Sequence, residues 1–296
     1  MPQAAGRLLL EGEKNMSHRP YETYMLITDL DGTLIPRGGV VSEANRAAIR
    51  SFVAGGGCFG IATGRTPEAA AGYVEGLPIN APCVFFNGSM LYDWGKQQVL
   101  ATRPLPPAAG GDKTIWPRFA RTCLEQFREA CIEVYTADNC HIISPAAYDD
   151  PRLAHEYYQY EHCAIDKLAD IDQTPWLKFF VNAEPAVLRQ LEQLAVDFGI
   201  TELADSFYSE VNYYEFVAKG ASKGAMLEEV RKLPAYEQLS IIAAGDYLND
   251  NAMLHLADIG VASGNAHALT KAAADRVGCD AQEHLMAWIM KNVVAC

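Results

Sequence analysis

The sequence predicts an α/β protein in which a doubly wound, mainly parallel sheet is interrupted by an inserted α+β domain. Short apolar runs recur along the chain, and most end in a polar, glycine-containing turn that leads into a segment of helical periodicity. This alternation is typical of β–α units around a parallel sheet. It breaks off between about residues 88 and 216 and then resumes. A chain of 296 residues is long enough for two domains at ~100–200 residues each.

Five short apolar runs are the expected strands of the parallel sheet. Each is short enough to be a buried strand. The runs cover residues 24–28, 58–62, 83–86, 239–244 and 259–261.

Helix start signals follow these runs. Ser42 is a suitable N-cap for a helix to residue 53, and the three glycines at 55–57 would end it. Thr66 followed by Pro67 is a strong helix start directly after a strand. A further helix is expected over residues 222–228.

The middle of the chain carries elements with one apolar face. Prolines and glycines between residues 104 and 111 mark a loop. Residues 132–135 alternate apolar with polar, which predicts a half-exposed strand, and residues 177–183 predict another. A helix over 185–198 has an apolar stripe along one side. These elements predict an α+β domain that covers the parallel core.

The expected domain limits follow from these patterns. We expect the core to comprise residues 21–88 and 215–296, with the inserted cap domain at 89–214. Residues 1–20 show no periodic pattern and are expected to be unstructured or a non-native extension. The natural start is expected at Met16, because residues with purine-rich codons precede it.

The composition excludes several classes of partner. The chain has 24 Lys and Arg against 37 Asp and Glu, a net charge of −13, and its basic residues form no run. We therefore expect no nucleic-acid partner and no anionic membrane surface. The apolar runs fall far short of the roughly 20 residues of a membrane span, and no signal peptide is evident. The eight cysteines show no Cys-x-x-Cys spacing, which indicates buried thiols in a cytoplasmic protein. The oligomeric state is not predicted.

Two carboxylates follow the first expected strand. Asp29 and Asp31 stand two residues apart in the segment Asp-Leu-Asp-Gly-Thr. Because side chains alternate along a strand, we expect both to point to one side at its carboxyl end, where ligands bind in open α/β sheets. Two adjacent carboxylates need a cation between them or a retained proton. An ordinary Asp-Gly turn is the alternative interpretation.

Three further sites of polar residues lie at the ends of other expected elements. Thr63 and Gly64 would offer a hydroxyl and backbone N–H groups to phosphate oxygens. Lys223 opens a helix, where a cation opposes the helix dipole and is better explained by a bound anion. The segment Gly-Asp-Tyr-Leu-Asn-Asp at 245–250 adds oxygen ligands that suit Mg²⁺.

Taken in order, these four motifs resemble those of the haloacid dehalogenase (HAD) superfamily of phosphohydrolases. Asn87-Gly88 after the third strand, the position of the inserted segment, and residues 222–224 and 260–265 make the chain similar to the Cof-type, subclass IIB branch. The resemblance spans residues 24–274. It implies a Rossmann-like core with an inserted cap and a Mg²⁺-dependent phosphatase that acts on a small phosphorylated metabolite.

The resemblance also implies residue roles. Asp29 would be the nucleophile that becomes an aspartyl phosphate, and Asp31 would be the general acid and then the base. Asp246 would be the principal Mg²⁺ ligand, joined by the Asp29 carboxylate and the Asp31 backbone carbonyl. Asp250 would support this metal site from its outer shell.

The phosphate group would be held by residues from three motifs. The resemblance assigns this role to the Thr63 hydroxyl and the Lys223 amine, and to backbone N–H groups of Leu30 and Gly64. Asn249 would lie close to the phosphate. The chemistry agrees, because the acidic site would repel a phosphoryl dianion without a divalent cation and Lys223.

Several interpretations stay open. Asn87 is either a turn residue or a substrate contact, and Arg65 either reaches the substrate or pairs with a nearby acid. Tyr247 and Ser263 depart from the family's usual residues, as do residues 276–279, so the substrate is not fixed.

Paired His and Glu residues between 155 and 162 could suggest a metal cluster, but a partly buried helix is the favoured interpretation there. A hexose phosphomutase is one alternative function. A phospho-aspartyl signalling or binding module without turnover is another.

Overall fold

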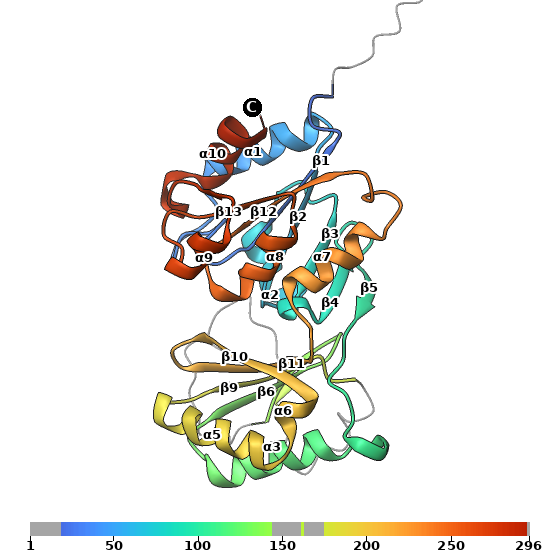
Figure 1. Ribbon diagram of the computed structural model, residues 1–296, viewed down its shortest axis with the longest axis vertical. Coiled ribbons are helices and arrows are strands. Elements are labelled where there is room, and N and C mark those ends of the chain that lie inside the picture. The colour runs from blue at the N-terminus through green and yellow to red at the C-terminus, as the bar shows by residue number, and fades with distance from the viewer. Residues whose placement is uncertain (1–18, 144–160, 163–174, 295–296) are drawn as a thin grey trace, which may run out of the picture.

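Five strands form a parallel sheet in the order β14-β13-β12-β1-β2 in the computed structural model, which describes residues 19–143, 161–162 and 175–294 (Figure 1). The fold class is therefore α/β with a parallel core and an inserted antiparallel cap, as predicted. The strands are β1 (Tyr24–Thr28), β2 (Cys58–Ile61), β3 (Pro82–Phe85), β4 (Met90–Asp93), β5 (Gln98–Thr102), β6 (Cys131–Tyr135), β7 (Cys140–Ile142), β8 (Glu161–His162), β9 (Lys178–Asn182), β10 (Ala204–Glu210), β11 (Tyr213–Ala218), β12 (Ser240–Gly245), β13 (Ile259–Ala262) and β14 (Arg276–Val277).

Helices cover both faces of this sheet, which explains why its strands are continuously apolar. Along β1, Met25 and Ile27 pack against α7 and α8, while Leu26 packs on the other face against α1, α2 and α10. The helices are α1 (Glu43–Ala54), α2 (Pro67–Val74), α3 (Ile115–Gln126), α5 (Pro185–Asp197), α6 (Ile200–Leu203), α7 (Lys223–Arg231), α8 (Asn251–Leu256), α9 (Ala268–Ala273) and α10 (Leu285–Ile289).

The predicted helix starts are confirmed by their caps. The Ser42 hydroxyl accepts a hydrogen bond from the Asn45 amide, and the Thr66 hydroxyl accepts one from the Ala69 amide at 2.9 Å. Ser222 caps α7 in the same way. Each cap satisfies one of the free N–H groups at a helix start and fixes where the helix leaves the sheet edge.

The inserted domain contains a second sheet in the order β10-β11-β9-β6-β7-β8. One face packs on α3 and α5 around aromatic residues such as Phe119, Phe179 and Phe216. In Figure 1 these helices lie on the side of the sheet away from the core. The other face meets the core, because Tyr135 and Phe180 belong to the core's apolar cluster.

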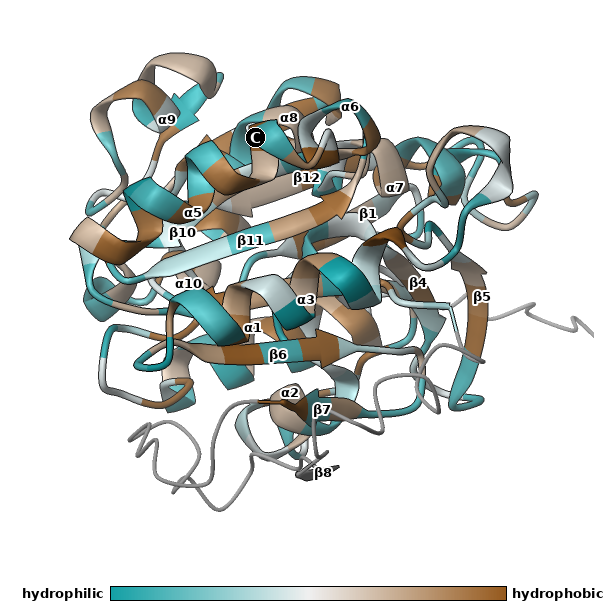
Figure 2. Ribbon diagram, turned by 90° about the horizontal axis from the view of Figure 1, so that it is seen from below, coloured by the Kyte–Doolittle hydropathy of each residue, from teal (hydrophilic) through white to brown (hydrophobic). Residues whose placement is uncertain are grey.

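The prediction of a half-exposed strand at 132–135 was wrong. All five residues of β6 are buried, including Glu133. Figure 2 shows β6 from the cap side as a largely apolar strand with one hydrophilic segment. Alternation predicts a solvated face only where nothing covers it, and here helices cover one face and the core covers the other.

The third expected strand has a different role from the predicted one. β3 joins the parallel sheet by a single bridge between Ala62 and Val84, and then pairs antiparallel with β4, which pairs with β5. Residues 90–102 thus form a hairpin beside β3, although they lie within the range 89–214 expected for the cap. The predicted limit at 214/215 falls inside β11, which pairs with β9. The cap sheet spans residues 131–218.

Three further expectations concern the middle of the chain and its cysteines. Residues 161–162 form strand β8 and not part of a helix, and the other residues of the expected 155–162 helix lie outside the described residues, as do residues 1–18. The six cysteines among the described residues are free thiols, and most are buried. Within the described ranges, no helix has the length and apolar character needed to cross a bilayer.

Candidate active site

A cluster of buried charges lies at the carboxyl edge of the core sheet. Asp29 follows β1 directly, and Lys223 is the first residue of α7. The Lys223 ammonium donates hydrogen bonds to Asp29 Oδ1 and to Asp250 Oδ1, both at 2.6 Å. The three side chains are 1%, 9% and 1% exposed, respectively, for Lys223, Asp29 and Asp250. The sequence therefore placed a lysine at this helix start correctly, and its anionic partners are two carboxylates of the protein.

Asp250 reaches this cluster because the loop after β12 folds back on its own backbone. Asp250 Oδ2 accepts hydrogen bonds from the amides of Asp246 at 2.9 Å and Tyr247 at 3.1 Å. A Cβ on Gly245 would lie 2.5 Å from the Asp250 Cβ, so only glycine fits at the strand end. The loop is thus held rigidly by the residue that also bonds Lys223.

Asp246 is held by the Asp-Gly-Thr segment after β1. The Thr33 hydroxyl donates to Asp246 Oδ1 at 3.1 Å. Gly32 has a φ of +87°, and a Cβ there would lie 2.3 Å from Asp246 Oδ2. Only glycine combines this backbone conformation with so close an approach. Sequence reasoning assigned no role to Gly32 or Thr33, although both belong to the motif that it singled out.

The pKa values in this cluster are shifted. Burial raises the pKa of the Asp29 carboxyl well above its usual range, with Asp250 and Asp246 adding to the rise and Lys223 opposing it. Burial, together with Asp250, raises the pKa of Asp246 to about 6. Burial disfavours the charged Lys223 ammonium, but its two carboxylate partners outweigh that effect and raise its pKa. The cluster is therefore short of positive charge.

The donor set fits a divalent metal ion. Asp29, Asp246 and Asp250 are buried, and each offers a carboxylate oxygen within 4.8 Å of the others. Lys223 is the one cation bonded to this cluster among the described residues, so three carboxylates face one ammonium. Oxygen-only donors of this kind suit Mg²⁺. The Asp31 carboxylate does not belong to this group. The resemblance implied only the backbone carbonyl of Asp31 as a metal ligand.

Asp31 and Arg65 form a separate pair at the edge of the cluster. Arg65 Nε and one terminal nitrogen donate to the two Asp31 oxygens at 2.7 and 2.8 Å. The Arg65 guanidinium also lies 4.4 Å from the ring centre of Tyr73. Of the two interpretations of Arg65, the structure shows pairing with an acid. Asp29 and Asp31 have different hydrogen-bond partners, Lys223 and Arg65, and both follow the last residue of β1, Thr28.

Thr63 and Gly64 lie on the same edge, after β2. The Thr63 hydroxyl accepts a hydrogen bond from the Arg65 amide at 3.2 Å. Within the described part of the chain, the backbone N–H groups of Leu30 and Gly64 have no hydrogen-bond acceptor. Free backbone donors beside a hydroxyl and a helix start are suited to phosphate oxygens.

Asn87 connects the core to the cap. Its amide nitrogen donates to Glu215 of β11 at 3.0 Å, and its amide oxygen accepts from Asn249 at 3.0 Å. Glu215 is paired with Lys178 of β9 at 3.3 Å, and Lys178 donates to the Gly64 carbonyl at 3.1 Å. Sequence reasoning missed Glu215 and Lys178. Their signal was a charge between apolar neighbours in a strand, which is unusual for a buried position.

The residues that depart from the family pattern have structural roles. The Tyr247 ring lies edge-on to His267, with centres 5.7 Å apart. Ser263 is buried, and its hydroxyl lies 3.5 Å from the Gly32 carbonyl. Asn265, which the sequence did not single out for a contact, donates to the same carbonyl at 2.8 Å. The hydrogen bonds from Ser263 and Asn265 hold the turn at Gly32, which packs against Asp246.

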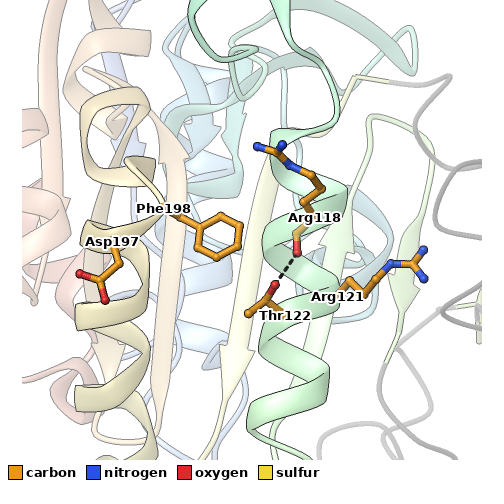
Figure 3. A pocket seen from close by; sticks show the side chains of 5 residues that line it. All are labelled: Arg118, Arg121, Thr122, Asp197 and Phe198. Atoms are coloured by element: carbon orange, nitrogen blue, oxygen red, sulfur yellow. Dashed lines mark hydrogen bonds between the residues drawn. The ribbon is translucent and has the colours of Figure 1, made fainter.

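A groove of about 510 Å³ lies elsewhere, between α3 and α5 on the outer face of the cap (Figure 3). It is lined by Arg118, Arg121, Thr122, Asp197 and Phe198. Thr122 is committed to the Arg118 carbonyl, and in Figure 3 the Arg121 side chain points away from Phe198. None of the residues that line the groove is buried, in contrast to the carboxylates and the lysine at the core edge.

A sequence model of the haloacid dehalogenase-like hydrolases matches residues 26–289. The chain is 26% identical over 259 residues to 5-amino-6-(5-phospho-D-ribitylamino)uracil phosphatase YcsE of Bacillus subtilis strain 168, covering 86% of this chain and 88% of that protein. It is 26% identical over 269 residues to pyridoxal phosphate phosphatase YbhA of Escherichia coli K12, covering 86% and 93%. A haloacid dehalogenase-like hydrolase from Bacteroides thetaiotaomicron superposes with a TM-score of 0.77 at 21% identity, covering 91% of this chain and 99% of that chain.

Proposed function

We infer the reaction from a premise that the sequence matches establish: the chain belongs to the haloacid dehalogenase-like hydrolase family and is a phosphatase of its Cof-type, subclass IIB branch. We propose that it is a Mg²⁺-dependent enzyme that hydrolyses a small phosphorylated metabolite through an aspartyl phosphate. The observation that carries this proposal is Asp29, buried and bonded to Lys223, beside Asp246 and Asp250. The relatives are named for chemically different substrates, so we propose only the class of substrate, a small phosphorylated metabolite.

We assign the first chemical step to Asp29 and Asp31. An Asp29 carboxylate oxygen attacks phosphorus, and the bond from phosphorus to the leaving oxygen breaks. Asp31 gives its proton to that oxygen, so the product leaves as an alcohol. The Asp31 side chain is 52% exposed and so stays within reach of solvent. In the structure both of its oxygens accept hydrogen bonds from Arg65, so one of these bonds opens when Asp31 carries the proton.

The second step returns the enzyme to its starting state. Asp31, now ionised, accepts a proton from a water molecule that attacks the phosphorus of the aspartyl phosphate. The bond between phosphorus and Asp29 breaks, and inorganic phosphate is released. In both steps the transferring group would lie against the Thr63 hydroxyl and the free N–H groups of Leu30 and Gly64, with Asn249 nearby. Such preorganised donors stabilise charge on the phosphoryl oxygens.

Asp29, Asp246 and Asp250 would hold the Mg²⁺ ion, with the Asp31 backbone carbonyl as a further ligand. When bound, the ion supplies positive charge that offsets the phosphoryl group and the carboxylates. Lys223 orients Asp29 at the edge of the sheet and favours its ionised form, which opposes the effect of burial on the Asp29 pKa. We also propose a cytoplasmic location, which the free thiols support.

The test is phosphate release by the purified protein with Mg²⁺ across a panel of phosphorylated metabolites. We expect turnover of at least one phosphomonoester and a phosphorylated protein species trapped on Asp29 by rapid acid quenching. Asp93→Asn is the matched control for Asp29→Asn, because Asp93 is a partly exposed carboxylate at the end of β4 and pairs with Lys96. Isomerisation of a hexose phosphate without phosphate release would indicate a mutase. Stoichiometric phosphorylation that stops would indicate a signalling module.

A further inference from the structure

We propose that Glu215, acting through Asn87, is a positioning residue that fixes Asn249 and the acidic loop at 245–250 from the inserted domain. The inference rests on the proposed function, because this loop carries two of the three carboxylates assigned to the metal ion. It goes beyond that function by assigning to one side chain of the cap a role in ordering the metal loop of the core.

The direction of the hydrogen bonds in this bridge follows from Glu215. An ionised carboxylate only accepts hydrogen bonds. Asn87 must therefore present its NH₂ group to Glu215, which turns its oxygen toward Asn249. Asn249 must in turn donate its own NH₂ group to Asn87. One charge on the cap thus sets the orientation of two amides in series, and the second amide stands next to Asp250.

The backbone at Asn87 indicates that this contact has a use besides stability. Phe86 and Asn87 both have positive φ, 51° and 54°. Residues with a Cβ adopt this conformation at a cost, and it persists where the surroundings demand it, often at functional sites. Here it aims a buried side chain, 3% exposed, between the cap and the loop. The backbone N–H of Asn87 also donates to the Thr63 carbonyl, so the same residue contacts the loop after β2 that would bind phosphate.

The partner of Glu215 supports the same reading. Lys178 and Glu215 are each 5% exposed at the side chain and lie 3.3 Å apart. A buried ion pair generally stabilises a protein no better than apolar residues of similar volume. Both charges also contact the core, Lys178 at the Gly64 carbonyl and Glu215 at Asn87. The pair therefore fixes the position of the cap relative to the loop at Gly64, which would bind phosphate, and, through Asn87, to the loop at 245–250, which would bind metal.

The test exchanges the charge within the bridge. In Asn87→Asp two carboxylates face each other, while an aspartate tolerates the left-handed conformation nearly as well as an asparagine. Glu215→Gln removes the acceptor that fixes both amides. In the double variant the glutamine donates to the new aspartate, which still accepts from Asn249, so the bridge and its single charge are restored. Glu210→Gln is the matched control, because Glu210 is an exposed carboxylate on the adjacent strand β10.

The readout is the concentration of Mg²⁺ or Mn²⁺ that half-saturates the rise in melting temperature, measured beside kcat and KM. We expect about a tenfold increase in this concentration for Asn87→Asp, since residues that orient metal ligands commonly contribute 10–100-fold to affinity. Glu215→Gln should give a smaller increase, and the double variant should return toward wild type. The metal-free melting temperature reports folding separately.

Additive losses in the double variant would overturn the proposal, as would unchanged half-saturation in both single variants or a wild-type protein that does not respond to either metal. Should Asn87→Asp fail to fold, the contrast between Glu215→Gln and Glu210→Gln decides. If the metal series behaves as expected while no substrate releases phosphate, the proposed function fails and the bridge stands.

Discussion

Two carboxylates that stand two residues apart in the sequence occupy opposite environments. Asp29 is buried against Lys223, and burial raises its pKa. Asp31 is half exposed, and its two oxygens accept hydrogen bonds from Nε and one terminal nitrogen of Arg65. A nucleophile benefits from a fixed, dry position, and a group that exchanges protons with a leaving group and with water benefits from access. The contrast therefore agrees with the roles proposed for the two residues. Substitutions that remove one partner at a time test that assignment.

The largest expected effect is that of Asp29→Asn. Because the covalent intermediate needs an anionic oxygen at this position, we expect a loss of about 10³-fold or more in kcat. The metal-free melting temperature should not fall, because the neutral amide ends the repulsion from Asp246 and Asp250, and Lys223 keeps Asp250 as its partner. Phosphate release and thermal unfolding, with Asp93→Asn as control, measure both. A fully active Asp29→Asn variant would refute the assignment of the nucleophile.

Asp31→Asn is expected to follow, with a loss of about 10²–10⁴-fold in kcat for removal of a general acid and base. Its effect on stability should be small, because exposed ion pairs contribute about 0–1 kcal/mol. A substrate with a good leaving group, which needs no proton, should lose less activity in its first step. If Asp31→Asn lowers the melting temperature as strongly as it lowers kcat, the group has a structural role instead.

The sequence predicted the charges of the core edge well and those of the cap not at all. Asp29 and Asp246 follow the short apolar runs of β1 and β12, and these parallel strands bring their carboxyl ends to one edge whatever the details of packing. Lys223 was predicted from its position at the start of a helix. Glu215 and Lys178 are different. They sit within strands of the inserted sheet, and Glu215 finds its core partner Asn87 128 residues away in the chain. Such a contact depends on how two domains meet, which no local pattern records.

The same reason explains the two errors in the fold. Strand β6 alternates apolar with polar residues and yet is buried on both faces, because the core covers the face that would otherwise be solvated. Strand β3 has the apolar character of a central parallel strand, but it continues into an antiparallel hairpin through β4. Local composition records neither what covers a strand nor which strand it pairs with.

A smaller effect is expected from Arg65→Lys, which sharpens the contrast at its exposed end. A lysine keeps the charge but cannot bind both Asp31 oxygens in one plane or stack on Tyr73 as a guanidinium does. We expect kcat to fall by about tenfold with little change in melting temperature, since only the orientation of the acid is lost. Steady-state kinetics over pH provide the measurement. An unchanged kcat would show that Asp31 needs no support from Arg65.

The pH dependence of stability should also differ between a buried and an exposed carboxylate. Burial and Asp250 raise the pKa of Asp246 to about 6 from a usual 3.8. The metal-free folded protein therefore binds an extra proton between these values, and its stability should rise as the pH falls through 6. Asp258 has the opposite sign. Burial opposes the shift, but the Ile241 amide and Arg231 outweigh it and lower the pKa of Asp258, so its contribution is lost as the pH falls.

Comparing Asp246→Asn and Asp258→Asn with wild type isolates the contribution of each carboxyl group to the change of stability with pH. Without divalent cation, Asp246→Asn should stabilise the protein at pH 7.5, by about 1–3 kcal/mol if the full shift in pKa is expressed, and should have little effect near pH 4. Asp258→Asn should destabilise it at pH 7.5 and less so at low pH. Chemical unfolding at several pH values with a chelator present is the measurement. Mg²⁺ should remove the advantage of Asp246→Asn at pH 7.5, because a bound cation stabilises the ionised carboxylate that the variant lacks. If the stability of the wild-type protein changes neither with pH between 4 and 7.5 nor with Mg²⁺, the charges of the buried carboxylates are balanced by other groups of the chain.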